Sequence, residues 1–455
     1  MRLTRLQKLA AIDWSGCCKI SGVALADTDS VKDAQIEMLA GRPVLDLRGE
    51  RRSYLIDLIT GSAIERVSPA QAGAVAAAYA TDARATAPRP ATPRPPAPRL
   101  SGLIDYDQWT VSGSFDADRP LYLFRLNDVL RTQVYISSST GKAVQITTGR
   151  ERFWNWLGSV PHWLYFAELR HRPALWTDVL IATSLAGCFL AAIGIYIGVC
   201  QLAAQPAGRW SPYQGFNLWH HAAGLVFGVF ALTWVLSGLL SMNPWGWLQG
   251  AATERERAQL RGGWEPSGAE LKAALQALVD AHPSETESLE LAPLNRRLYF
   301  VSSKPGGARQ RLDAGALPAS LNDEDLGYIA GALGGGTVPI VPKLMQREDT
   351  YYFSHHRDRV PLPVYRMMLE GDSGTRYYID PVSGELLAKI DKSAKGYRWL
   401  HEGLHRMDFS AALRAHPTWD TLMLLLMSGV TLVCATGAYL GLRRLCRTRV
   451  QNRLS

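Results

Sequence analysis

The sequence has little cysteine, and its cysteines lack the spacing of a disulfide framework or a metal site. Six cysteines occur among 455 residues, and no two of them form a CxxC pair. Cys188, Cys200 and Cys434 lie in or at the end of long apolar segments, and only the adjacent Cys17 and Cys18 could lie outside the cytoplasm. Neither a disulfide scaffold nor a thiolate metal centre is therefore expected.

Recognisable catalytic motifs are also lacking. The glycine run at 334–336 is not followed by the GK[ST] of a phosphate-binding loop, so it indicates a flexible turn. The sequence has no HExxH helix, no nucleophile triad, and no flavin or nicotinamide fingerprint. Electrons for any redox reaction would have to come from a partner protein or from the quinone pool.

Charged residues are absent from three stretches that are long enough to cross a bilayer, which requires roughly 20 apolar residues. These stretches are Val179–Cys200, Ala222–Met242 and Thr421–Leu442. With their aromatic flanks they predict transmembrane helices over 179–200, 217–242 and 421–442. For any single stretch, the alternative is a buried helix of a soluble protein.

Basic residues near the ends of the spans predict the orientation. Five arginines and no acidic residue follow the last span, so the tail 443–455 is expected in the cytoplasm together with the loop 201–216. Residues 1–178 and 243–420 then share the other compartment, the periplasm of a bacterial inner membrane. The net charge of +8 lies largely in the tail and in a proline-rich linker. This pattern fits the lipid bilayer as a partner, and it does not fit nucleic acid.

The first 30 residues are unusual for the start of an exported region. Asp13 and Lys19 interrupt the apolar stretch between Met1 and Ala26, so it is too polar for a span and weak as a signal peptide. We expect that a first transmembrane helix of related proteins is missing here. A weak cleavable signal is the alternative.

The chain contains a repeat at a constant offset of 243 residues, without a gap. The repeated residues of the first copy are Pro120, Tyr122, Leu126, Thr132, Tyr135, Ile136, Gly141, Trp156, Leu157, His162 and Phe166. In the second copy the same residue types recur, in the same order, as Pro363, Tyr365, Leu369, Thr375, Tyr378, Ile379, Gly384, Trp399, Leu400, His405 and Phe409. Each copy ends shortly before a predicted span. This pattern predicts a duplicated unit of extramembrane domain, histidine and membrane helix.

The extramembrane regions predict small α+β modules. Val31–Leu39 has helical spacing, Val44–Ile59 alternates as strands do, and a helix at Ser267–Leu278 precedes a strand at Arg297–Ser302. Strand, turn and strand recur around Gly141 and Gly384. The expected order is an atypical N-terminus (1–30), a module (31–80), an extended linker rich in Pro, Ala and Arg (81–100), a second module with an interfacial segment (101–178), two spans, a second extramembrane region (243–420), the last span and the tail.

Several runs resemble the PepSY-associated transmembrane family. They are DQWTVSG (107–113), RFWNWLGSVPHWLYF (152–166), NLWHHAAG (217–224), YYFSHHR (351–357), YYIDPVSGELL (377–387) and YRWLHEGLHRMDF (397–409). The resemblance covers nearly the whole chain from about residue 32. It implies a bacterial inner-membrane protein with periplasmic PepSY modules, usually with four transmembrane helices. It also implies similarity to ferric-siderophore reductases that carry haem b between their helices.

Histidines near the spans are the candidate haem ligands, because neutral imidazole binds haem iron well. His162 and His405 occupy equivalent positions of the repeat and are predicted to hold one haem near the periplasmic surface. The alternative places both in an interfacial aromatic belt. That belt would include Trp156, Trp163, Trp176, Trp399 and Trp419.

Further histidines extend this prediction. His220 lies four residues before Gly224, the HxxxG spacing that the resemblance implies for a ligand of a second haem, and His221 is its neighbour. Both could instead be snorkelling residues at a helix start. His401 lies four residues before His405 and is a second-choice ligand or a contact for a haem propionate. In the second extramembrane region, His355, His356 and Arg357 could bind an anionic ligand or form a solvated loop.

These observations predict a membrane oxidoreductase with haem b that passes electrons to a periplasmic ferric-siderophore or a similar iron complex. Reduction to Fe(II) weakens chelation by hard oxygen ligands and so releases the metal. The competing hypothesis is a non-catalytic membrane anchor whose modules bind periplasmic proteins or peptides, or assist a metal transporter. A three-helix chain could also pair as a homo-oligomer to complete a bundle.

Overall fold

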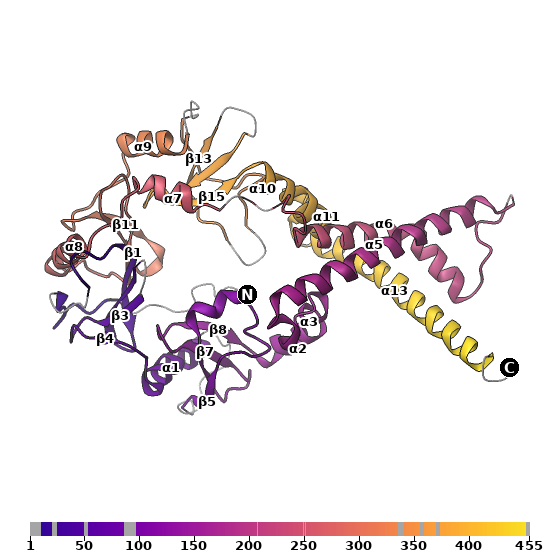
Figure 1. Cartoon of the computed structure of the whole chain (residues 1–455), viewed down its shortest axis with the longest axis horizontal. Helices are drawn as coiled ribbons and strands as arrows, with labels where there is room; N and C mark the ends of the chain where they lie inside the picture. Colours follow the sequence, from indigo (N-terminus) through magenta and orange to yellow (C-terminus); the bar gives the residue numbers. More distant parts are fainter. Residues whose placement is uncertain are drawn as a thin grey trace. The chain divides into compact units, whose positions relative to one another are not determined.

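Two compact units make up the structure, a computed structural model that describes residues 11–20, 25–49, 53–85, 97–206, 208–248, 250, 252–334, 341–354, 359–369 and 374–451. Unit 1 comprises Met1–Arg172 with Ala252–Lys389, and unit 2 comprises Pro173–Ala251 with Ile390–Ser455. Unit 1 contains both strands and helices, whereas the described part of unit 2 is almost entirely helical (Figure 1). The predicted α+β class with three long apolar helices is therefore confirmed.

The largest sheet of unit 1 has seven strands in the order β11-β10-β9-β1-β2-β3-β4, with antiparallel neighbours throughout. The strands are β1 (Val31–Leu39), β2 (Arg42–Gly49), β3 (Ser53–Asp57), β4 (Ala63–Ile64), β9 (Ser288–Leu291), β10 (Tyr299–Ser303) and β11 (Arg309–Asp313). Ile36 of β1 pairs with Leu45 of β2 on one side and with Leu289 of β9 on the other. Strands from both predicted extramembrane regions thus form one sheet. The sequence pattern predicts separate modules for these strands.

The helix predicted at Val31–Leu39 is wrong, because this segment is strand β1. Ile36 belongs to a core with helix α8 (Gly268–Ala281), whereas Leu39 belongs to another core with helix α1 (Pro69–Ala85). A strand that buries side chains on both faces loses the clean alternation of a half-exposed strand. Its partners β2 and β9, rather than its own periodicity, fix its conformation. The predicted helix at Ser267–Leu278 and the predicted strand at Arg297–Ser302 are confirmed by α8 and β10.

Two four-stranded sheets complete unit 1. One has the order β5-β6-β7-β8 and the other the order β12-β13-β14-β15. The strands are β5 (Arg99–Ile104), β6 (Leu121–Arg125), β7 (Gln133–Ser137), β8 (Ala143–Thr147), β12 (Lys343–Met345), β13 (Val364–Met368), β14 (Arg376–Ile379) and β15 (Leu386–Ile390). Strands β6, β7 and β8 begin 243 residues before β13, β14 and β15, respectively, which is the offset of the sequence repeat.

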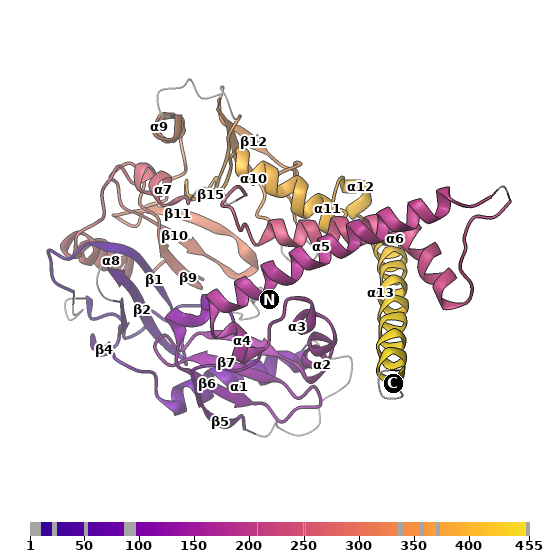
Figure 2. The same ribbon diagram turned by 45° about the vertical axis from the view of Figure 1, so that its right-hand side comes forward.

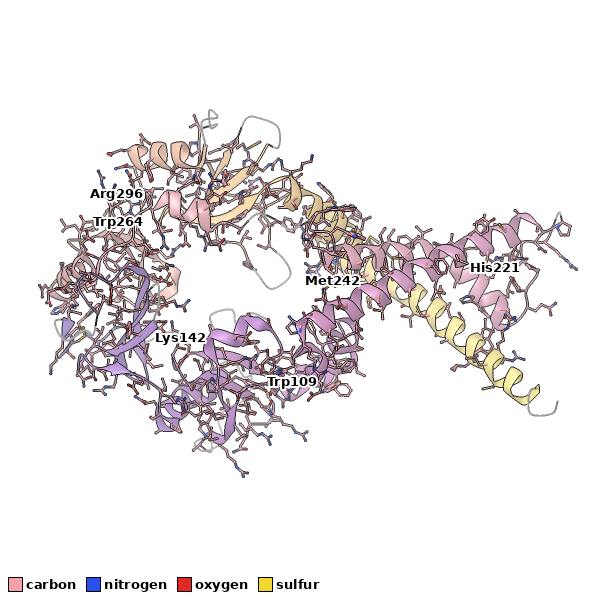
Figure 3. All side chains as sticks on the ribbon, viewed as in Figure 1. Trp109, Lys142, His221, Met242, Trp264 and Arg296 are labelled. Carbon is pink, nitrogen blue, oxygen red and sulfur yellow. A yellow bond between two sulfur atoms is a disulfide. The ribbon has the colours of Figure 1, made fainter. Side chains whose placement is uncertain are left out.

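The predicted hairpin turns at Gly141 and Gly384 are confirmed, and each tip packs against a neighbouring core. Both glycines have positive φ angles, 71° and 76°. A Cβ on Gly141 would lie 2.8 Å from Cδ1 of Leu39. Next to Gly141, Nζ of Lys142 lies 2.8 Å from Oδ2 of Asp46 and 3.2 Å from Oε1 of Glu37, so this hairpin is joined to the seven-stranded sheet (Figure 3).

The N-terminal region and the linker differ from their predicted structures. Ile12 and Ile20 are buried in the core of the seven-stranded sheet, so residues 11–20 pack as part of unit 1. Cys17 and Cys18 form a disulfide between adjacent residues. Helix α1 continues to Ala85, so residues 81–85 of the predicted extended linker are helical. Residues 86–96 lie outside the described residues.

The three predicted spans are confirmed as helices long and apolar enough to cross a membrane. They are α5 (Pro173–Ala203), α6 (Phe216–Ser241) and α13 (Thr418–Gln451), of which Thr418–Cys446 is the candidate span. Helix α6 packs against both α5 and α13 (Figure 2). At the contact with α13, a Cβ on Gly429 would lie 2.3 Å from Cδ1 of Phe227. Only glycine therefore allows this approach.

Short helices precede two of the spans in the sequence. The segment before α5 contains α2 (Gly149–Leu157), α3 (Ser159–His162) and α4 (Ala167–Arg170), which belong to unit 1. The segment before α13 belongs to unit 2. It contains α10 (Lys392–Tyr397), a π-helical turn η4 (Arg398–Gly403), α11 (Leu404–Arg406) and α12 (Ala411–Arg414). Unit 1 also contains α7 (Glu254–Leu260) and α9 (Asp323–Gly334).

Candidate functional site

Histidine side chains contact helix α6 near both of its ends. His220 and His221 belong to its first two turns, whereas His401 and His405 contact Trp234 and Ser237 in its last turns. Figure 3 shows His221 and Met242 at opposite ends of this helix. At 1.5 Å per residue, the 14 to 17 positions between His220 and these contacts span roughly 21–26 Å. Helix α6 therefore carries two histidine sites at different depths.

His401 and His405 form the first of these sites. Their rings stack with centroids 5.1 Å apart and an interplanar angle of 21°. Nδ1 of His405 lies 3.1 Å from the carbonyl oxygen of Trp234 and 3.1 Å from Oγ of Ser237. Nδ1 of His401 lies 3.4 Å from the carbonyl oxygen of Ser237. Because a carbonyl oxygen only accepts hydrogen bonds, both rings carry their proton on Nδ1.

This protonation leaves Nε2 with the lone pair, which is the form of imidazole that binds a metal. His401 is buried, and this loss of hydration lowers its pKa against the smaller opposing effect of the Glu402 charge. The ring is therefore neutral at pH 7. Of the two ring nitrogens of His401, only Nδ1 has a hydrogen-bond partner in the described part of the chain.

Ion pairs and a backbone contact fix the segment that carries His401 and His405. Asp408 accepts from Arg398 at 3.3 Å and from Arg414 at 2.8 Å. Nε1 of Trp419, at the start of α13, donates to the carbonyl oxygen of Arg406 at 2.8 Å. The π-helical turn η4 contains His401, and such turns often occur at functional sites because they shift a side chain relative to the α-helical positions.

His220 forms the second site with α13. Its Nδ1 lies 3.1 Å from Oγ1 of Thr436, and that hydroxyl donates to the carbonyl oxygen of Leu432 at 2.6 Å. Since the hydroxyl proton is already used, Oγ1 accepts from Nδ1 of His220, and Nε2 again keeps its lone pair. A Cβ on Gly437 would lie 3.1 Å from Cε1 of His220, so the glycine makes room for the ring.

His221 differs from His220 because both of its ring nitrogens are engaged. Nε2 donates to the carbonyl oxygen of Gly198 at 2.9 Å, and Nδ1 lies 2.8 Å from Oγ of Ser211. The rings of Trp210 and His221 stack with centroids 6.1 Å apart and an interplanar angle of 8°. These contacts join α6 to α5 and to the loop between them, so they give His221 a structural role.

The remaining predicted residues fall elsewhere. His162 is an exposed residue of unit 1 at the end of α3, next to Trp163, whereas His405 belongs to unit 2. His355, His356 and Arg357 lie outside the described residues. In the described chain, no group of three or more His, Cys, Asp or Glu side chains has the arrangement of a metal site.

The residues of the first site fit one imidazole ligand for a haem, but not two. His401 and His405 lie on one face of one helical segment and stack side by side, so they cannot bind opposite sides of the same iron. A second ligand would have to come from another element. Trp234, whose carbonyl oxygen contacts His405, also has a buried indole donor, Nε1, without an acceptor in the described structure. Such a donor suits an anionic substituent such as a propionate.

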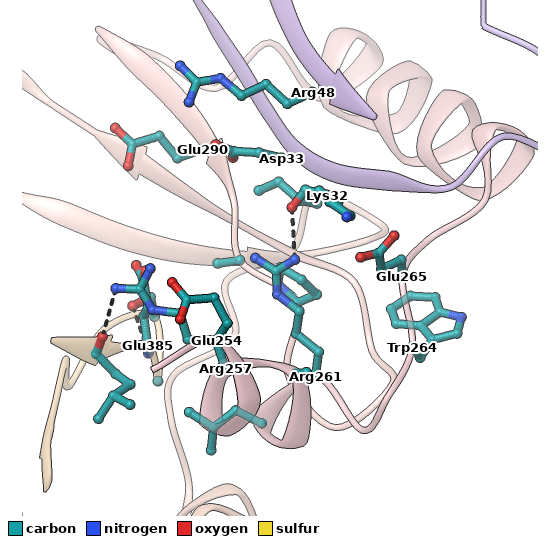
Figure 4. A pocket seen from close by; sticks show the side chains of 18 of the residues that line it. Lys32, Asp33, Arg48, Glu254, Arg257, Arg261, Trp264, Glu265, Glu290 and Glu385 are labelled. Carbon is teal, nitrogen blue, oxygen red and sulfur yellow. Dashed lines mark hydrogen bonds between the residues drawn. The ribbon is translucent and has the colours of Figure 1, made fainter. Parts of the chain in front are cut away.

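Unit 1 contains a separate cavity of about 980 Å³, lined by charged side chains of both signs (Figure 4). The charged lining residues are Lys32, Asp33, Arg48, Glu254, Arg257, Arg261, Glu265, Glu290 and Glu385. Arg261 is held by a 2.9 Å hydrogen bond to the carbonyl oxygen of Lys32. Loss of hydration raises the pKa of Glu385, and the charge of Arg257 opposes this shift. In the described structure, Arg48, Glu254 and Glu265 form no ion pair.

Two buried tyrosines, each paired with a half-buried aspartate, were not among the predicted residues. The hydroxyl of Tyr135 donates to Asp107 at 2.7 Å, and the hydroxyl of Tyr378 donates to Asp349 at 2.8 Å. Each aspartate also accepts backbone N–H groups two and three residues further along the chain. Tyr135 and Tyr378 occupy equivalent positions of the sequence repeat. Asp107 precedes Tyr135 by 28 residues, and Asp349 precedes Tyr378 by 29 residues. This nearly constant spacing in the two copies could have indicated the pairs from the sequence.

The fold and the histidine sites together define a class, an α+β protein with three candidate membrane helices and imidazoles arranged along the central one. Comparison with protein families, curated proteins and solved structures gave no match for this chain. The resemblance to the PepSY-associated transmembrane family therefore stays a prediction from the sequence.

Proposed function

We propose that unit 2 is an electron-carrying membrane module that holds haem b, and that it reduces a ferric-siderophore or related iron complex on the side of unit 1. This proposal rests on one observation, the protonation state that three imidazoles share. In His220, His401 and His405, Nδ1 is bound to an oxygen acceptor, so Nε2 is the nitrogen without a proton. Haem would supply a one-electron couple at each site.

Two sites along α6 suit transfer across a bilayer. The roughly 21–26 Å between them covers most of the hydrocarbon thickness of about 30 Å. His405 is the proposed ligand of the site that contains His401, with His162 as its predicted partner from the repeat. His220 is the proposed ligand of the other site, and the quinone pool or a partner protein is the proposed electron donor. The proposed location is the inner membrane of a bacterium.

An absorption spectrum of the purified chain tests this proposal. Protein from haem-replete cells should show a Soret band and the reduced α band of haem b. His405→Ala and His220→Ala should each diminish that band. His416→Ala is the matched control, because this histidine is exposed and paired with Asp420 at 2.7 Å. His221→Ala should retain the band while lowering thermal stability. A wild-type protein without a Soret band would overturn the proposal.

A second candidate function is a non-catalytic binding module anchored in the membrane, for periplasmic proteins or peptides or as an aid to a metal transporter. The charged cavity of unit 1 favours it, because its volume suits a small ligand or the end of a chain. A colourless wild type whose binding of a partner is lost in Arg257→Ala would support this function over electron transfer.

A further inference from the structure

Helix α2 of unit 1 presents large apolar side chains to the outside. Phe153 and Trp154 are each 58% exposed, and Leu157 is 62% exposed. Leu157 lies four positions after Phe153 and three positions after Trp154, so it neighbours both on the helix surface. The rings of Phe153 and Trp154 are 5.4 Å apart, and the three side chains form a continuous apolar surface. An ordinary surface helix turns such a face toward the core.

The polar residues of α2 hold the helix in this orientation. Thr148 and Glu151 form a capping box at its start. Nη1 of Arg152 donates to the carbonyl oxygen of Thr147 at 3.0 Å, and Nη2 donates to the carbonyl oxygen of Arg131 at 2.8 Å. The polar side of the helix is therefore bonded to the sheet β5-β6-β7-β8, and the apolar side is left outward.

The apolar surface extends beyond the helix. We call it the α2 patch and define it by the exposed residues Val129, Leu130, Phe153, Trp154, Trp156, Leu157 and Phe166. The rings of Trp156 and Phe166 are 6.3 Å apart, and the backbone N–H of Gly149 donates to the carbonyl oxygen of Leu130 at 2.8 Å. The ring contact extends the apolar surface from α2 to Phe166, and the backbone contact joins the loop of Val129 and Leu130 to the start of α2. Exposed apolar side chains grouped in this way indicate an interaction surface.

Chain connectivity identifies what covers the patch. Helix α4 ends at Arg170, and the first candidate span begins at Pro173, so the chain enters the bilayer directly after this segment. The exposed Arg150 precedes Phe153 by three positions, where its guanidinium can reach lipid phosphates while the rings lie deeper. Tryptophan and phenylalanine with a flanking arginine are typical of helices that lie in the membrane interface.

The repeat provides an independent argument. Trp156, Leu157 and Phe166 correspond to Trp399, Leu400 and Phe409, which are also exposed but belong to unit 2, immediately before its last span. The same three apolar residues thus precede a membrane helix in both copies.

We propose that the α2 patch inserts into the interfacial layer of the bilayer and that Arg150 binds the phosphates of anionic phospholipids at its rim. The patch would hold unit 1 against the membrane surface. This proposal does not depend on haem.

Photo-crosslinking in native membranes tests the occupant of the patch. The full-length chain would carry benzoylphenylalanine in place of Trp154, or in place of Leu317 as the control. Leu317 is 65% exposed in the same unit but lies between β11 and α9, outside the patch. We expect a yield of lipid adducts, identified by mass, that is several-fold higher at position 154 than at position 317.

Three other outcomes would overturn the proposal. Adducts at position 154 with helices of the same chain would identify an intramolecular cover, and dimer formation on a gel would identify a second copy. A lipid yield equal to that of the control would mean that the patch faces water. A circular dichroism melt of both substituted chains checks that they are folded, and both sites tolerate a large aromatic because they are exposed.

Discussion

At the scale of single residues, a histidine can bind a metal only when one ring nitrogen keeps its lone pair. The backbone oxygens of α6 and the hydroxyl of Thr436 decide which nitrogen that is in His220, His401 and His405. The sequence indicated these histidines as candidates from their spacing and their position near the spans. The HxxxG spacing favoured His220 over His221, but the reason that His221 is engaged lies in contacts with Gly198 and Ser211 that only the packed helices create.

Asp349 offers a residue-scale prediction about pH. Burial alone would raise its pKa, but the backbone N–H groups of Tyr351 and Tyr352, together with Arg366 and Tyr378, outweigh burial and hold the pKa below its ordinary value of 3.8. A carboxylate with a depressed pKa contributes its full stability above the unfolded pKa and loses it as the pH falls through the folded pKa.

We therefore expect Asp349→Asn to lower the free energy of unfolding of unit 1 by about 1–3 kcal/mol at pH 7. The difference from wild type should shrink as the pH falls below about 4. Denaturant midpoints followed by tryptophan fluorescence between pH 7 and pH 3 would measure it, for the full-length chain. Asp116→Asn is the control, since its carboxylate is 58% exposed. A difference that stays constant over this range would contradict the prediction.

At the scale of elements, the sequence predicted the three long apolar helices well, because a helix that is apolar all round gives a signal that no partner strand can override. It also predicted the hairpins at Gly141 and Gly384. It failed for β1, whose neighbour β9 lies far away in the sequence. Strand pairing over such a separation is decided by tertiary contacts, which local periodicity does not contain.

The hairpin tips give an element-scale prediction. Gly141→Ala should destabilise unit 1 by about 1–2 kcal/mol, because alanine is strained at the positive φ of this residue. The new Cβ would also collide with Leu39, which should cost a further amount of about 1–3 kcal/mol. Gly41→Ala is the matched control. Gly41 has a φ of 81° and no atom within 4 Å of the added Cβ, so it reports the backbone strain alone. Equal losses of thermal stability in the two variants would show that the Leu39 contact costs nothing.

At the scale of the whole molecule, the seven-stranded sheet restricts the topology. Strands β1 to β4 precede α5 and α6 in the chain, whereas β9 to β11 follow them, and all seven strands share one sheet. Both groups must therefore lie on one side of the membrane, which requires an even number of crossings between them. The two candidate spans α5 and α6 satisfy this requirement, as the predicted orientation assumes.

Labelling with a membrane-impermeant maleimide tests the predicted orientation. In intact spheroplasts, we expect Leu317→Cys to be labelled and the native Cys446 to be protected until the membrane is permeabilised. Both positions are exposed in the structure, so protection would not come from burial inside the protein. Comparison with Cys446→Ser assigns the signal. Labelling of Cys446 before permeabilisation would reverse the orientation.

The sheet also dictates an order of events during synthesis. About 250 residues separate β1 from β9, so at about 5–20 residues per second the ribosome needs roughly 12–50 s to supply the missing neighbour. During that interval β1 is an unpaired edge, and unpaired edges invite aggregation. The sheet can close only after α5 and α6 have been made, so two candidate membrane helices leave the ribosome before the largest sheet of unit 1 can be completed.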